Sequence, residues 1–232
     1  GPNGAGKTTT VRVLATLLKP DSGSAKVAGL DVLKDPDEVR KVIGLSGQYA
    51  AVDETLTGWD NLIMFGRLYH LSNKQAQQRA TELLEQFSLT DRAKSPIRTY
   101  SGGMRRRLDL AASLIIRPKV LFLDEPTTGF DPEARRQFWD LINSLRESGT
   151  TILLTTHYLD EAEALADRVA VINHGKIIEV ATPATLGNRQ NSLAIVKWRD
   201  GFKEVGNPTE LVKELSSKYQ GEVPELQVIR PS

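Results

Sequence analysis

The start of the chain restricts its fold more than any other stretch. Gly1 to Thr8 read G-P-N-G-A-G-K-T, which fits G-x-x-x-x-G-K-[ST], a glycine-rich loop whose backbone N–H groups cradle phosphate at a helix N-terminus. In this pattern Lys7 is expected to pair with the β- and γ-phosphates, and Thr8 to ligate Mg²⁺. A purification-tag scar would explain a leading Gly-Pro but not Gly6-Lys7-Thr8. The motif therefore predicts a nucleotide site where a strand meets a helix.

Composition and charge exclude several classes of protein. The chain has 232 residues, with 30 Lys and Arg against 29 Asp and Glu and a net charge of +1, so it lacks the excess of positive charge that holds nucleic acid or an anionic membrane non-specifically. Its longest stretch without a charged residue, 148–159, is shorter than the roughly 20 apolar residues that span a bilayer. The absence of Cys excludes disulfides and thiolate metal sites. We therefore expect membrane contact only through a protein partner.

Apolar spacing divides the chain into alternating strands and helices. Short runs rich in β-branched residues at 120–123, 151–154 and 169–172 are typical of buried parallel strands. Apolar residues three and four positions apart indicate amphipathic helices around 80–87 and 138–145. Helix N-caps are expected at Thr57, Ser72 and Asp131. This alternation predicts an α/β fold with a mostly parallel sheet.

Two interruptions of this pattern suggest the domain organisation. Helical patterns between about 57 and 116 lack an obvious strand, so we expect a helical insertion within an α/β domain that spans 1–187. Residues 188–232 read as strand, turn, helix and strand, which predicts a partial α+β accessory domain. The glycine loop needs a strand that leads into it, and no strand precedes it in the sequence. We therefore expect a fragment of a longer subunit, with N-terminal strands missing.

Two acidic residues follow the aliphatic run at 120–123. Asp124 and Glu125 would stand at the carboxyl edge of a parallel sheet, where such sheets bind ligands. Asp124 suits a Mg²⁺ site, and Glu125 suits a base that orients the attacking water. Alone, the pair is more often a solvated strand end. Behind a phosphate-binding loop, it predicts the second half of a nucleotide site.

A second glycine-rich helix start occurs at Ser101-Gly102-Gly103. It could receive an anion through free N–H groups and the helix dipole, although a turn with a helix-ending glycine is the commoner reading. One nucleotide has no evident need for two glycine-rich helix N-termini from the same chain. The helix start at 101–103 therefore suggests a dimer in which each nucleotide contacts both chains. The following Arg105-Arg106-Arg107 is interpreted as a solvated helix face and not as a nucleic-acid site.

Taken together, these motifs resemble a known family. The glycine loop, 101–103, Asp124-Glu125, 129–131 and His157 stand in the order and spacing of the ATP-binding subunit of ABC transporters, over about 1–187. The resemblance implies a P-loop NTPase core, with the signature motif in the helical insertion, that binds ATP and Mg²⁺ and hydrolyses ATP.

The resemblance also implies roles for individual residues. Gln48 would sense Mg²⁺ and the attacking water, His157 would hold the γ-phosphate, and Asp131 would belong to a loop that crosses the dimer interface. Without the family, Gln48 and His157 would be read as ordinary polar residues. The implied nucleotide-binding residues are Asn3, Gly4, Gly6, Lys7, Thr8, Thr9, Ser101, Gly103 and Asp131; the implied Mg²⁺ ligands are Thr8, Gln48 and Asp124; the implied catalytic residues are Glu125, His157 and Gln48.

Finer features point to one branch of that family. Tyr100 and Met104 replace the commoner residues of the Leu-Ser-Gly-Gly-Gln signature, and together with 50–54 and 155–162 they are similar to daunorubicin/doxorubicin-type drug exporters. This likeness implies an exporter of drugs, antibiotics or lipid-like compounds. The expected partners are a transmembrane permease docked near 48–61 and a second ATPase subunit, with no nucleic acid. The expected location is the cytoplasmic face of the cell membrane, as a peripheral protein.

Two other functions fit parts of the pattern. A soluble ABC ATPase that acts on DNA or ribosomes would show a long coiled-coil insertion or a second cassette with a basic linker, and the sequence shows neither. A non-catalytic nucleotide binder would not be expected to keep Glu125 and His157.

Overall fold

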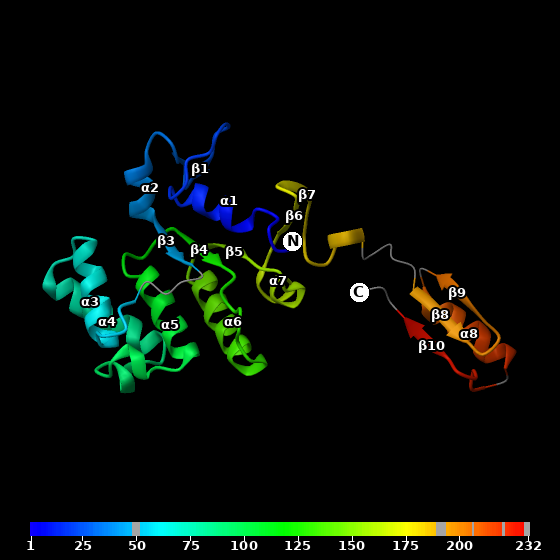
Figure 1. The fold of residues 1–232 in the computed structure, drawn as a ribbon. Helices are drawn as coiled ribbons and strands as arrows, with labels where there is room; N and C mark the ends of the chain where they lie inside the picture. The colour runs from blue at the N-terminus through cyan, green and yellow to red at the C-terminus, as the bar shows by residue number, and fades with distance from the viewer. Residues whose placement is uncertain (48–51, 189–193, 206, 220, 230–232) are drawn as a thin grey trace. The chain divides into compact units, whose positions relative to one another are not determined.

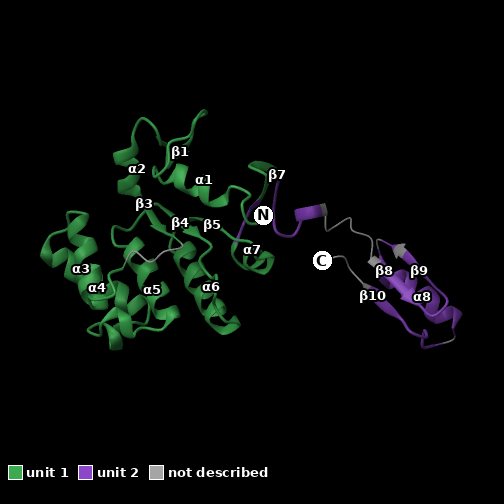
Figure 2. Cartoon of the chain, viewed as in Figure 1, with its two compact units in different colours: residues 1–165, 171–178 green, residues 166–170, 179–232 purple. Residues whose placement is uncertain are grey.

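The structure is a computed structural model that describes residues 1–47, 52–188, 194–205, 207–219 and 221–229. The chain divides into two compact units, one of residues 1–165 with 171–178 and one of residues 166–170 with 179–232 (Figure 2). These units are defined by contacts, and they do not show which segment folds independently. The expected domain boundary after residue 187 therefore stays a prediction.

A parallel sheet forms the centre of the first unit. Its strand order is β3 (Ile43–Ser46), β4 (Val120–Asp124) and β5 (Thr151–Thr155), with β4 in the middle. The register pairs Ser46 with Leu123 and Asp124 with Thr155, so the three carboxyl ends meet at one edge. The predicted α/β fold with a parallel sheet is confirmed, and this edge is where the candidate site lies.

Alternate residues of β4 face two different hydrophobic clusters, because side chains along a strand point to opposite faces. Phe122 packs with α1 (Lys7–Leu14) and α2 (Pro36–Val42), which lie above the sheet in Figure 1. Leu121 and Leu123 pack with residues of α5 (Gly102–Ser113) and α6 (Pro132–Glu147) on the other side. Both faces of the central strand are thus covered, as a parallel sheet requires. The short strands β1 (Lys26–Val27) and β2 (Leu30–Asp31) form an antiparallel hairpin beside α2.

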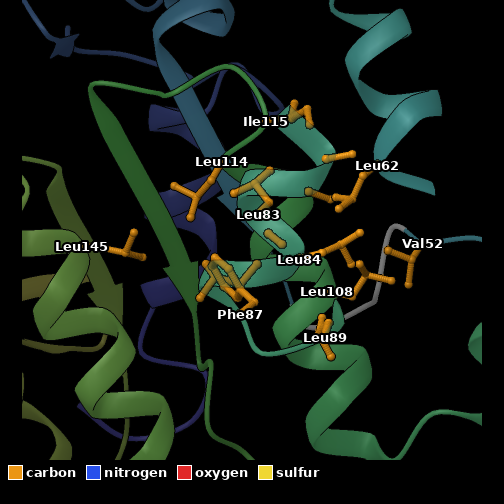
Figure 3. Close-up of a cluster of buried hydrophobic side chains, with 14 of the residues drawn as sticks. Val52, Leu62, Leu83, Leu84, Phe87, Leu89, Leu108, Leu114, Ile115 and Leu145 are labelled. Carbon is orange, nitrogen blue, oxygen red and sulfur yellow. The ribbon is translucent and has the colours of Figure 1, made fainter. Parts of the chain in front are cut away.

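The described residues from 57 to 116 form helices and turns, with no strand beyond one isolated bridge. The elements are α3 (Gly58–Leu68), α4 (Asn73–Gln86), the 3-10 turns Thr90–Arg92 and Ile97–Thr99, and α5. Their apolar faces share one core, with Leu62, Leu83, Phe87 and Leu108 among its fully buried members (Figure 3). The predicted helical insertion is present.

The expected helix starts are confirmed at all three positions. Thr57 and Ser72 accept hydrogen bonds from backbone N–H groups in the first turns of α3 and α4. Asp131 Oδ1 accepts from the N–H groups of Glu133 and Ala134 at 3.0 and 2.9 Å, at the start of α6. These caps satisfy N–H groups that a helix leaves without partners.

One strand prediction was wrong in its pairing. Residues Val169–Asn173 form β6, but β6 belongs to a two-stranded sheet with β7 (Lys176–Ala181) and not to the described parallel sheet. The reason is local, because His174 and Gly175 have φ of 46° and 73°, as a two-residue hairpin turn requires. An aliphatic run specifies a strand, but it does not specify the partner. Between β5 and β6 the chain forms α7 (Leu159–Leu165).

The second unit contains a small α+β arrangement. An antiparallel sheet has the order β10 (Gln227–Ile229), β8 (Ala194–Trp198), β9 (Gly201–Val205). Helix α8 (Pro208–Lys218) packs on it through Leu211 and Leu215, which contact the fully buried Val196. A short 3-10 turn, Leu186–Asn188, precedes this group. The predicted strand, turn, helix and last strand are present, but the prediction missed β9, which follows the turn and pairs with β8.

Candidate nucleotide-binding and catalytic site

The glycine loop packs closely against the turn between β6 and β7. A Cβ atom on Gly1 would lie 2.1 Å from the carbonyl oxygen of Ile172, so no larger residue fits there without a backbone shift. Ala5 O accepts the N–H of Gly175 at 2.9 Å. Gly6 caps α1 with φ of 106°, a backbone region that side chains disfavour. The loop is therefore held in place, and α1 begins directly behind it.

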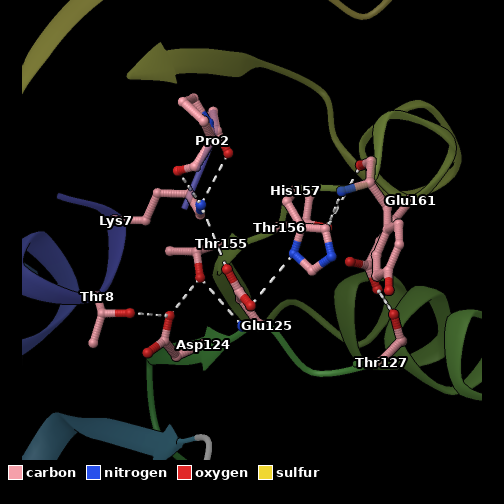
Figure 4. A network of polar contacts seen from close by, with 12 residues as sticks. Pro2, Lys7, Thr8, Asp124, Glu125, Thr127, Thr155, Thr156, His157 and Glu161 are labelled. Carbon is pink, nitrogen blue, oxygen red and sulfur yellow. Dashed lines mark hydrogen bonds and ion pairs between the residues drawn. The ribbon is translucent and has the colours of Figure 1, made fainter. Parts of the chain in front are cut away.

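Lys7 lies inside this loop. Its side chain is buried, and Nζ donates to the carbonyl oxygens of Gly1 and Pro2 at 2.9 Å each (Figure 4). Nζ also lies 3.4 Å from Glu125 Oε1. The structure thus joins the predicted phosphate-binding lysine to the predicted catalytic carboxylate, although 118 positions separate them in the sequence.

Thr8 and Asp124, both predicted Mg²⁺ ligands, contact each other. The Thr8 hydroxyl donates to Asp124 Oδ1 at 3.1 Å, and Asp124 is 4% exposed. A hydroxyl and a carboxylate are hard oxygen donors of the kind that Mg²⁺ prefers. They stand beside a helix N-terminus that favours phosphate. The residues present therefore fit a site for Mg²⁺ and a phosphate chain.

Glu125 lies between two basic side chains. Its Oε1 faces Lys7, and its Oε2 lies 3.4 Å from His157 Nδ1. Its own side chain is 13% exposed and that of His157 is 29% exposed. The carboxylate is therefore sheltered but keeps access to solvent.

Thr155 belongs to the site although the sequence analysis gave it no role. Its hydroxyl donates to Asp124 Oδ1 at 2.6 Å. The backbone N–H of Glu125 donates to both the hydroxyl and the carbonyl oxygen of Thr155, at 3.2 and 3.1 Å. The available signal was its position at the end of a predicted strand, where a polar residue faces the carboxyl edge.

Glu161 is a second residue that the sequence analysis missed. It is fully buried in α7, and its Oε1 accepts from the Thr127 hydroxyl at 2.8 Å and from Trp139 Nε1 at 3.3 Å. Its Oε2 has no hydrogen-bond partner among the described residues. The carboxylate joins the helix after His157 to the loop after Glu125. No sequence signal distinguished it from the other acidic residues of α7.

The signature residues line a cavity of about 860 Å³. Ser101 caps α5 by accepting the N–H of Met104 at 3.2 Å. Gly103, Glu125 and Asp131 line the same cavity, whereas its lining among the described residues does not include the loop at 1–9. The structure therefore places Ser101, Gly103 and Asp131 around one cavity with Glu125, and Lys7 is not among the described residues that line it.

The interpretation of the three α5 arginines as a solvated face was wrong for Arg106, whose side chain is 13% exposed, whereas the side chain of Arg105 is 37% exposed. Each guanidinium has a protein partner, because the first turns of α5 lie among loops with accepting groups. Arg105 pairs with Glu54 at 2.9 Å, and Arg107 donates to the carbonyl oxygen of Phe87 at 3.2 Å. Arg106, with a 13% exposed side chain, donates to the carbonyl oxygens of Gly47 and Pro126 and lies 4.0 Å from Asp109. Burial lowers the pKa of Arg106 from its usual value.

Two sequence predictions cannot be placed. Gln48 and residues 50–51 lie outside the described residues. The remaining predicted loop residues, Asn3, Gly4 and Thr9, are exposed around the start of α1.

Within the described part of the chain, no helix is both long and apolar enough to cross a bilayer.

Known proteins are similar to most of this chain. The family described as ABC transporter matches residues 1–128. The daunorubicin resistance ATP-binding protein DrrA2 of Streptomyces coeruleorubidus is 62% identical over 188 residues, which are 81% of this chain and 58% of that protein. The linearmycin resistance ATP-binding protein LnrL of Bacillus subtilis is 40% identical over 197 residues, which are 85% and 63% of the two proteins. The chain therefore spans less than two thirds of the length of these relatives.

A solved structure shows the same fold. CbiO1 from Clostridium perfringens, described as part of the ABC transporter complex cbiONQ, has a TM-score of 0.73 and 26% identity, over 80% of this chain and 76% of that one. The family match covers more than half of the chain and includes the glycine loop, the signature residues and the Asp124-Glu125 strand end. The chain therefore belongs to the ABC transporter family, as its motifs indicate.

Proposed function

We propose that the chain is the ATP-hydrolysing part of a subunit that powers an exporter of drugs, antibiotics or lipid-like compounds. The observation that carries this proposal is the meeting of Lys7, Thr8, Asp124, Glu125 and His157 at one edge of the parallel sheet. Export is supported by the relatives, which are described as daunorubicin and linearmycin resistance ATP-binding proteins. These descriptions favour export over an ATPase that acts on DNA or ribosomes.

In this proposal the glycine loop binds the phosphate chain of ATP. The backbone N–H groups of Gly4, Gly6 and the first turn of α1 face the phosphates, and Lys7 pairs with them. Asn3 and Thr9 contribute further polar contacts at the rim of the loop. Lys7 can exchange its contacts with the loop carbonyls and Glu125 for the phosphates, since all of these partners lie within reach of one ammonium group.

Thr8, Asp124 and Gln48 are proposed to hold Mg²⁺, which when bound neutralises phosphate charge. Glu125 orients the attacking water and accepts its proton, and its place between Lys7 and His157 keeps the carboxylate directed into the site. His157 donates toward the γ-phosphate. These roles need positioned charges and no covalent chemistry by the protein, as is usual for phosphoryl transfer.

Ser101, Gly103 and Asp131 are proposed to act on the nucleotide of a second copy. They line one cavity with Glu125, and the described lining of that cavity does not include the loop that carries Lys7, which supports a role on the nucleotide of another copy. The proposed active unit is a dimer with two shared sites. The proposed membrane partner is a permease subunit docked near 48–61, which would place the protein at the cytoplasmic face of the cell membrane.

The catalytic proposal is tested by Glu125→Gln in the natural protein that carries this sequence. ATP hydrolysis should fall about 10²- to 10⁴-fold, because a general base is removed, while ATP binding persists. Glu147→Gln, at the exposed end of α6, is the matched control and should leave turnover unchanged. Loss of ATP binding with normal turnover per bound nucleotide would contradict the role of Glu125.

The shared sites are tested by mixing two inactive variants. Lys7→Ala and Ser101→Arg should each abolish hydrolysis in a pure dimer. A mixed dimer regains one intact site out of two, because Lys7 of the Ser101→Arg chain and Ser101 of the Lys7→Ala chain are both unchanged and serve the same nucleotide. Mixtures that show no more activity than the separate variants would exclude shared sites.

A further inference from the structure

Thr155, the last residue of β5, contacts both candidate carboxylate residues (Figure 4). It stands opposite Asp124 in the register of the parallel sheet and is 8% exposed. Its hydroxyl donates to Asp124 Oδ1 at 2.6 Å and accepts the backbone N–H of Glu125 at 3.2 Å. The Thr155 hydroxyl therefore donates one hydrogen bond to Asp124 and accepts one from Glu125, two neighbouring residues of the site.

The backbone of Glu125 has a conformation that needs such support. Its φ is 49°, in the left-handed region, which residues with side chains disfavour and keep only where their surroundings hold them. Its N–H donates to the hydroxyl and to the carbonyl oxygen of Thr155, at 3.2 and 3.1 Å. Because the Glu125 side chain extends from this backbone, Thr155 helps set the direction of its carboxylate toward Lys7 and His157.

Asp124 Oδ1 receives two hydroxyl groups, from Thr8 at 3.1 Å and from Thr155 at 2.6 Å. Thr8 is itself a proposed Mg²⁺ ligand, so its hydroxyl has a second task. Thr155 has no such task, and its shorter hydrogen bond orients the carboxylate. The neighbouring Thr156 does not duplicate this role, because its hydroxyl oxygen accepts the N–H of Tyr158 at 2.9 Å.

We propose that Thr155 is a positioning residue whose single hydroxyl orients Asp124 for Mg²⁺ and Glu125 for the attacking water. This inference rests on the proposed ATPase function. Residues that orient a metal ligand typically change metal affinity or activity about 10- to 100-fold when they are lost. Loss of the hydroxyl should therefore affect Mg²⁺ dependence and turnover together, and it should leave the binding of ATP itself almost unchanged.

The test compares Thr155→Val, Thr155→Ser and Thr151→Val in the natural protein. Valine keeps the β-branched shape and the backbone carbonyl but removes the hydroxyl, whereas serine keeps the hydroxyl. Thr151, at the exposed start of the same strand, is the control for a Thr-to-Val change in β5. The measurements are kcat, the Mg²⁺ concentration for half-maximal rate, and equilibrium binding of a fluorescent ATP analogue with and without Mg²⁺.

Thr155→Val should lower kcat and raise the required Mg²⁺ concentration, each about 10- to 100-fold, with metal-free analogue binding within about twofold of the unchanged protein. Thr155→Ser should recover most of both losses, and Thr151→Val should show neither. Equal impairment in the Val and Ser variants, or no change in the Val variant, would overturn the inference. If Thr155→Val does not fold, Thr155→Ala against Thr155→Ser gives the same comparison. If the unchanged protein binds MgATP without hydrolysing it, the ATPase proposal fails, and the Mg²⁺ dependence of analogue binding still decides the role of Thr155.

Discussion

The turn before the signature residues depends on a close contact between Gly58 and Tyr100. A Cβ atom at Gly58 would lie 2.4 Å from the Tyr100 hydroxyl oxygen, and the next side-chain atom is 3.4 Å away. Tyr100 is 4% exposed, and its hydroxyl donates to the carbonyl oxygen of Arg92 at 2.7 Å. Burial raises the pKa of this hydroxyl, so it stays a neutral donor. We expect Gly58→Ala to displace the hydroxyl and break this hydrogen bond.

The two substitutions should therefore be strongly non-additive. Gly58→Ala should cost about 1 to 3 kcal/mol of unfolding free energy, as overpacking typically does. Tyr100→Phe should cost about 1 kcal/mol, the net value of one buried hydrogen bond, because Arg92 O keeps a second donor in the N–H of Ser95 at 2.9 Å. In the double variant the clashing oxygen is absent, so the total loss should stay near that of Tyr100→Phe alone.

Urea unfolding of the four proteins, with the midpoint and the slope fitted for each, measures the coupling. The expected interaction energy is about 1 to 3 kcal/mol in favour of the double variant. Additivity within about 0.5 kcal/mol would refute the reasoning and would mean that α3 shifts to accept the methyl group. Because Tyr100 directly precedes Ser101, the cycle also reports how firmly the signature turn is held.

Three further outcomes are expected. Hydrogen bonds from Arg117 and Arg79 lower the pKa of Glu82 from 4.5 to about 2. The Glu82 carboxylate therefore stabilises the fold above pH 4.5 and loses this effect as the pH falls toward 2. Glu82→Gln should remove that part of the acid sensitivity, no more than about 1 kcal/mol for a solvent-screened pair, in unfolding curves at pH 3 and 6. Asp131→Ala should cost about 1 kcal/mol in thermal melts and Asp131→Asn almost nothing, since asparagine also caps helices. Arg106→Met should destabilise the protein by about 3 kcal/mol or more, as removal of one partner of a buried pair does, whereas Arg105→Met at its exposed ion pair should cost less than about 1 kcal/mol by the same measurement.

Local patterns were sufficient to predict much of the fold and the main side chains of the site. The glycine loop, the caps at Thr57, Ser72 and Asp131, and the strand end at Asp124 each depend on a few adjacent residues. Such signals are complete within a short window, because turn geometry and capping are set by nearby backbone groups. The pairing of Val169–Asn173 with β7 was missed because the partner of a strand is not specified by the residues of that strand. Aliphatic residues make a strand favourable without determining which edge it joins.

The residues that the sequence did not indicate act across elements. Arg106 contacts backbone carbonyls 59 and 20 positions away, and Glu161 contacts a hydroxyl 34 positions away. The residues around Arg106 and around Glu161 have the pattern of an amphipathic helix. That pattern does not reveal whether a charged residue at the edge of the apolar face contacts solvent or a loop. The answer depends on which loops pack against that helix, and therefore on the tertiary fold.

Thr155 shows how little extra information would have been needed. Once β4 and β5 are known to be parallel neighbours with Asp124 opposite Thr155, the two side chains must share one face of the sheet at its carboxyl edge, because paired residues point the same way. A hydroxyl beside a buried carboxylate then has an obvious acceptor, and leaving it without one would cost free energy. From the sequence alone, Thr155 is interpreted as a strand-forming residue. Knowledge of the strand order and register would have been enough to predict that it orients the site.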